Sequence, residues 1–178
     1  MTLYRDQLVE AVVSTLLAAN TLAGEKVYSN RNWPTAIQGL PIIRVKGIYE
    51  RKQSLVRGSP QFTTTSTIAL FIQTTGDTEA AAEIAGATIC EQIEQAVIAG
   101  NSPVDQMVQQ FSAVETEIRS SSEGEQPIAE ILLKIDCEFY ENIVVINGDE
   151  LCGVGMDVSV PGNSTPITAG VGTISSNI

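Results

Sequence analysis

The chain has 178 residues, a length that fits one domain or one domain with an added arm. Its formal net charge of −11 excludes strong sequence-independent binding of nucleic acid over the whole surface, because such binding depends on Lys and Arg at the phosphates. A hydrophobic content of 43% allows a packed core, which Ile, Val, Leu and Ala must build because only 5% of the residues are aromatic.

The cysteines and the N-terminus indicate a reducing compartment. Cys90, Cys137 and Cys152 form no CxxC pair and are odd in number, so a disulfide framework is not expected. The sequence has no run of 18 apolar residues, and its start, MTLYRDQLVEAV, lacks the basic region and apolar block of a signal peptide. These features predict a cytoplasmic setting without membrane contact.

The N-terminal part predicts one helix, a brief strand and a tryptophan with two possible roles. Residues 3–19 have apolar side chains at helical spacing. These are Leu8, Val12, Leu16 and Ala19. Val27 and Tyr28 predict a short strand. Trp33 precedes Pro34, which favours an extended backbone there, and the tryptophan either caps the core or anchors an interface.

The next segment predicts two strands joined by a long polar loop. Residues 41–49 alternate between an apolar face and a face with two cations, and residues 50–60 are polar. Residues 62–74 are rich in β-branched side chains and apolar on both faces at the centre, which is typical of an inner strand.

Residues 78–99 predict the second main helix. The segment Gly76-Asp77-Thr78 ends the preceding strand and offers an N-cap. The expected apolar stripe consists of Ala81, Ile84, Thr88, Ile89, Ile93 and Val97.

Two further strands complete the prediction, over residues 112–120 and 128–140, and they form an antiparallel hairpin. The order of elements predicts an α+β fold, with a mixed or antiparallel sheet of about four to five strands and two main helices packed on one side. This domain spans residues 1–147. Residues 148–178, rich in Gly, Ser, Thr and Val, predict an extended C-terminal arm that is either a floppy terminus or a source of a strand for a neighbouring sheet edge.

The side chains of common catalytic sites are missing. The sequence has no histidine, which removes the commonest general base and most zinc sites, and it has no Gly-rich phosphate loop. Of two carboxylate pairs, Glu79 with Glu83 is typical of a solvated face, and Asp136 with Glu138 is typical of a solvated or interface face. We therefore expect no enzyme activity, no metal and no cofactor.

The basic residues are unevenly distributed. Five of the ten Lys and Arg residues lie between positions 44 and 57, on an otherwise acidic chain. These are Arg44, Lys46, Arg51, Lys52 and Arg57. A basic hairpin on an acidic body suits contact with the next copy of the chain, and a repeated heterologous contact closes a ring. With Trp33, they form the predicted subunit interface. The alternatives are a chance cluster on a solvated hairpin and a local contact with DNA.

Three segments carry a resemblance to a known family. They are RDQLVEAVVSTLLAA, VYSNRNWPTAIQGLPIIRVKG and TSTIALFIQTTGDTEAAAEIAGATICEQIEQAV, separated by a polar hairpin. Over roughly residues 4 to 140, this order resembles the tail terminator (tail completion) proteins of long-tailed bacteriophages. The arm after residue 148 is not part of the pattern.

The resemblance implies a hexameric ring at the head-proximal end of the tail tube, in the virion, after assembly in the host cytoplasm. Such a ring ends tube polymerisation, binds the tube protein and presents a surface to head-completion or neck proteins. DNA passes through its lumen without specific binding, and no cofactor is implied. The alternatives are another tail or neck component, such as a tube subunit or a connector, and a small-molecule binding module.

Overall fold

The computed structural model describes residues 3–29, 39–58, 60–99, 101–121 and 127–143. Trp33, Cys152 and the predicted arm over 148–178 lie outside the described residues, so the predictions about them stay predictions.

Two helices, five strands and one short 3₁₀ turn make up the described part of the chain. In chain order they are α1 (Tyr4–Ala19), β1 (Val27–Ser29), β2 (Ile42–Ser54), β3 (Gln61–Thr75), α2 (Glu79–Val97), the 3₁₀ turn (Asp105–Met107), β4 (Gln110–Ser121) and β5 (Ile128–Asn142). The Thr78 side chain accepts a hydrogen bond from the Ala81 N–H, which confirms the predicted N-cap of α2.

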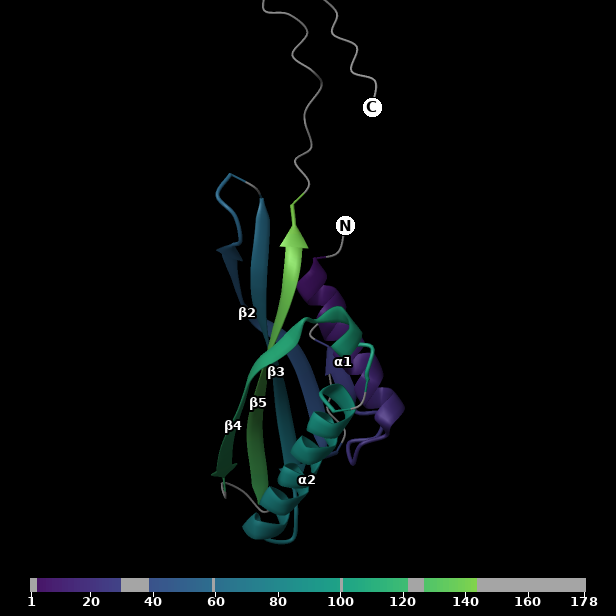
Figure 1. Ribbon diagram of the computed structural model, residues 1–178. Helices are drawn as coiled ribbons and strands as arrows, with labels where there is room; N and C mark the ends of the chain where they lie inside the picture. Colours follow the sequence, from purple (N-terminus) through teal and green to yellow (C-terminus); the bar gives the residue numbers. More distant parts are fainter. Residues whose placement is uncertain (1–2, 30–38, 59, 100, 122–126, 144–178) are drawn as a thin grey trace, which may run out of the picture. The chain divides into compact units, whose positions relative to one another are not determined.

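The strands form one mixed sheet in the order β1-β2-β3-β5-β4. β1 runs parallel to β2, and the other neighbours are antiparallel, including the predicted hairpin of β4 and β5. Both helices lie on the same face of the sheet (Figure 1). The predicted α+β class, with two helices on one side of a mixed sheet, is confirmed.

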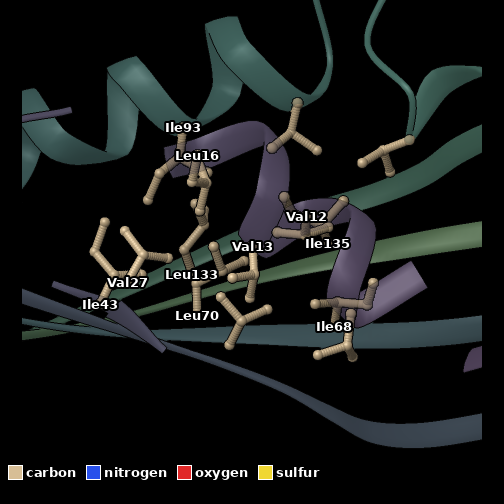
Figure 2. Packing of buried hydrophobic residues seen from close by; sticks show 14 of the residues in the cluster. Val12, Val13, Leu16, Val27, Ile43, Ile68, Leu70, Ile93, Leu133 and Ile135 are labelled. Carbon is tan, nitrogen blue, oxygen red and sulfur yellow. The ribbon is translucent and has the colours of Figure 1, made fainter. Parts of the chain in front are cut away.

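The core lies between the helices and this face of the sheet. Figure 2 shows Val12 and Leu16 of α1 and Ile93 of α2 packed over side chains of the central strands. On β3 the core-facing positions are Ile68, Leu70 and Ile72, and all three are buried. Towards the start of β3 this face continues with Ser66 and Thr64, which are buried opposite the core residues Cys137 and Phe139 of β5. We call the opposite face, which neither helix covers, the open face.

Three sequence predictions are wrong in detail. Residues 50–54, predicted as loop, belong to β2, because pairing with β3 satisfies their backbone groups without an apolar face. Ala81 and Ile84 were expected in the apolar stripe of α2 but are exposed, Ile84 at 67%. Ala19 is likewise exposed, at the C-terminal end of α1.

Candidate assembly surface

The open face of the sheet carries a ladder of polar contacts between neighbouring strands. The Thr67 hydroxyl donates to Asp136 at 2.6 Å, and the Gln73 amide donates to Glu130 at 2.7 Å. Two further contacts link β4 to β5: Gln110 to Glu138 at 3.1 Å and Lys134 to Glu115 at 3.1 Å. Each contact joins two directly opposite residues, as expected of stabilising cross-strand pairs. The carboxylates of Asp136 and Glu138 are therefore engaged in sheet contacts.

Two shallow hollows lie on this open face. One, of about 260 Å³, lies between Tyr49 of β2 and Lys134 of β5. The other, of about 170 Å³, is lined by Arg44, Phe71 and Arg119 among others. Arg44 lies over the Phe71 ring at 5.4 Å from its centre, which is a cation–π distance. Within the described residues, no group of three His, Cys, Asp or Glu side chains could hold a metal ion.

The end of the β2–β3 hairpin projects beyond the start of α1 (Figure 1). All residues from 51 to 58 are exposed, including the adjacent apolar pair Leu55 and Val56 at 48% and 55%. The turn is held by the Leu55 N–H, which donates to the Gln61 carbonyl, and by the Ser54 hydroxyl, which donates to the Val56 carbonyl. The turn thus presents two apolar side chains on an ordered support outside the core of its own chain.

An ion-pair cluster joins β2, β3 and β5 at the base of this hairpin end, on the sheet face that the helices cover. Lys52 Nζ lies 2.5 Å from Glu141 and 3.4 Å from Glu50. The Thr64 hydroxyl donates to the same Glu141 carboxylate at 3.1 Å. The Glu141 contact, as a hydrogen bond, is the main cause that raises the pKa of Lys52 above its ordinary value. Lys52 therefore connects β2 to β5 within its own chain.

The structure separates the predicted interface cations into three groups. Arg44, Lys46 and Arg51 lie on the open face, whereas Lys52 lies on the helix side and Arg57 at the hairpin turn. A bulge between Gly47 and Tyr49 explains this, since it reverses which residues of β2 face the helices. Among the described residues, Lys46, Arg51 and Arg57 make no ion pair.

Strand β4 is a surface that the sequence did not indicate. It is the last strand in the sheet order, and only its start, at Phe111, packs against the core. Residues 112 and 114–119 are all exposed, and Val114 and Ile118 are 42% and 52% exposed on the helix side. In the sequence, residues 112–120 alternate only weakly between apolar and polar side chains. This pattern is typical of a strand without a buried face.

The helix layer is a strongly acidic part of the described surface. α2 has four glutamates and no Lys or Arg, and the segment from Gly58 to Ile118 contains no basic residue at all. The glutamates are Glu79, Glu83, Glu91 and Glu94. Among the described residues, no helix is long and apolar enough to cross a membrane.

Comparisons with known proteins do not assign the chain to a family. No family model matches the chain, and no curated protein matches it. One solved structure that matches is described as "Virion of native gene transfer agent (GTA) particle". Its chain is 14% identical, with a TM-score of 0.49, over 74% of this chain and 95% of that chain. At this level of similarity, the match decides neither the family nor the role.

Proposed function

We propose that the chain is a structural virion protein that assembles with copies of itself into a ring, about six subunits around, at the head-proximal end of a phage tail tube. There it ends tube polymerisation and provides the surface that joins the head. The tail location and the terminator role come from the sequence resemblance. The assembly itself is the part that the geometry supports.

The observation that carries the proposal is the projecting hairpin end. Leu55 and Val56 are exposed side by side, and Arg51 and Arg57 beside them have no ion pair within the described residues. Apolar side chains held outside the core on a fixed turn gain free energy when another surface covers them, at about 25 cal/mol per Å² of apolar area. No described element of the chain packs on this turn, so a second subunit is the expected partner.

A ring follows if this contact is heterologous. The hairpin end is basic and apolar on an otherwise acidic chain, so the surface that receives it on the next copy differs in chemistry. A contact between two different surfaces repeats from copy to copy, and it closes into a ring when the rotation allows. The tail tube protein and the head-completion or neck proteins would then bind the two flat sides of the ring. We also propose that the chain has no enzyme activity and binds no cofactor.

The proposal is tested by the mass and shape of the purified protein. We expect light scattering to give about six times the 19.0 kDa of one chain, and negative-stain images to show single rings with a central hole. Added to growing tubes of its own tail, the protein should bind their ends and stop growth. Long stacks of rings would instead identify a tube subunit.

A hairpin variant provides the control. Leu55→Ser with Val56→Ser removes the apolar pair without touching the core, and we expect a monomer with an unchanged thermal unfolding temperature. A wild-type chain that stays monomeric at high concentration contradicts the proposal, and so does a turnover of substrate by the monomer.

A further inference from the structure

We propose that β4 of one copy pairs edge to edge with the outer half of β2 in the next copy, in antiparallel orientation, so that the sheet continues from subunit to subunit. This inference rests on the proposed ring and names the surfaces that form it.

Strand β4 has the properties of a strand whose neighbour is missing. Along 12 residues it pairs with β5 and with no other described strand, and its exposed residues include both sheet faces. A long exposed edge presents a row of unpaired N–H and C=O groups, which favour the addition of another strand. Val114 and Ile118 add an apolar strip on the helix side.

The second free edge in the described sheet is the outer half of β2. The first strand, β1, pairs only with Ile43, Arg44 and Val45. From Lys46 to Ser54, the outer side of β2 faces no described strand. The sheet therefore ends in two exposed edges of different residues, as a heterologous contact between copies requires.

The directions of the strands are compatible with this pairing. β2 and β5 run the same way, because each is antiparallel to β3, and β4 runs against β5. β4 is therefore antiparallel to β2. Copies rotated about an axis along the strands keep the direction of β2, so β4 meets the next β2 in antiparallel orientation, which forms without a crossover connection.

The two edges also carry opposite charge where they lie at the same height. The strand pairing places Lys134 of β5 opposite Glu115 of β4 and in the same row as Lys46 of β2. In the same way, Glu138 of β5 lies opposite Gln110 of β4 and in the same row as Arg51 of β2. Over this stretch, the open face of β4 and β5 has Glu115, Asp136 and Glu138 against the single cation Lys134. The matching stretch of β2 presents Lys46 and Arg51, which make no ion pair within the described residues. Because both charged sets lie on the open face, a continued sheet brings them together.

A charge exchange between the edges tests the pairing. One variant carries Glu115→Lys and Glu138→Lys, and the other carries Lys46→Glu and Arg51→Glu. Each variant alone places like charges on both edges, so we expect at least tenfold weaker self-association in low salt. Mixed at equal concentration, the two should form an assembly of the wild-type mass with alternating copies, which native mass spectrometry reads directly because the variants differ in mass.

The control has the same change of charge at a different place. Glu79→Lys with Glu91→Lys, on the exposed side of α2, should assemble as the wild type does. Circular dichroism should show all variants folded.

The outcomes separate this inference from the proposed function. A wild-type chain that remains monomeric overturns both. A wild-type ring with variants that assemble alone, or with a mixture that fails to assemble although both variants are folded, overturns only the pairing. β4 would then be left to the C-terminal arm or to a different protein.

Discussion

Gly86 shows how one residue sets the distance between a helix and the sheet. It is buried in α2, and a Cβ at this position would overlap the end of the Ile131 side chain on β5 and lie 3.4 Å from the Thr74 hydroxyl. Glycine usually weakens a helix interior. Here it allows α2 to lie directly on β5.

Gly86→Ala should therefore destabilise the protein, although the same change in an open helix position stabilises by about 0.5–1 kcal/mol. Overpacking against the buried Ile131 costs about 1–3 kcal/mol and outweighs that gain. Urea unfolding of the variant measures the net loss.

Two controls test the cause. Ala87→Gly, at the exposed neighbouring position, should cost about 1 kcal/mol from helix propensity alone. Ile131→Val removes the overlapping methyl group, so Gly86→Ala should cost less in that background. Equal costs in both backgrounds would mean that Ile131 does not limit the approach of the helix.

At the residue scale, the sequence predicted burial well where a strand alternates. In the sequence, Cys137 stands between the polar residues Asp136 and Glu138, a pattern that favours burial, and it is buried, which raises the pKa of its thiol to about 12. Cys90 of α2 is also buried. The stripe of α2 was less well predicted, because Gly86 carries no hydrophobic signal and Ile84, although apolar, faces solvent.

At the scale of elements, the extent of β2 and its bulge were not predictable from the pattern of side chains. Residues 50–54 are polar, and only pairing with the Thr-rich start of β3 makes them a strand. Strict alternation would place Lys52 on the same face as Arg44 and Lys46. The bulge at Ile48 instead moves Arg51 to that face and Lys52 to the helix side. The cluster of five cations predicted from the sequence is thus divided between the two faces and the turn.

This division predicts that charge reversal has different effects at Arg51 and at Lys52, which are adjacent on β2 and face opposite sides of the sheet. Arg51→Glu should weaken self-association in a salt-dependent way and leave the fold unchanged, because Arg51 has no partner in the described chain. Lys52→Glu should instead loosen the hairpin end, since it places a third carboxylate beside Glu50 and Glu141.

Hydrogen exchange separates the two effects. In Lys52→Glu, the amides of residues 49–54 and 61–66 should exchange faster while those of the core stay protected. In Arg51→Glu, the exchange of the isolated subunit should match the wild type, and light scattering should show the loss of assembly. Similar behaviour of both variants in both measurements would contradict the assignment of the two side chains to opposite faces.

For the molecule as a whole, the helices carry a clear excess of negative charge, whereas the strands are close to balanced, with seven acidic and six basic residues. The two helices contain six acidic residues and one basic residue, Arg5. Six of the ten basic residues lie on β2, β4 and β5, and Arg57 is at the hairpin turn. The sequence revealed the net charge and the position of the basic segment. It could not show that the six acidic residues of the helices lie in one layer, because that depends on both helices covering the same face of the sheet.

The acidic helix layer predicts that the assembled protein does not retain duplex DNA, even in about 50 mM salt, where contacts to phosphate are strongest. Like charge opposes adhesion of DNA to a surface of this sign.

Replacing Glu79, Glu83, Glu91 and Glu94 by Lys should produce DNA binding. The logarithm of its association constant should fall linearly with the logarithm of the salt concentration, as counterion release requires. The matched variant with four Gln residues keeps the shape of the helix but supplies no cation, so it should remain without affinity. Fluorescence anisotropy of a short labelled duplex measures all three proteins. Salt-dependent binding by the wild type would show that its basic sheet residues, rather than its acidic helices, meet the DNA.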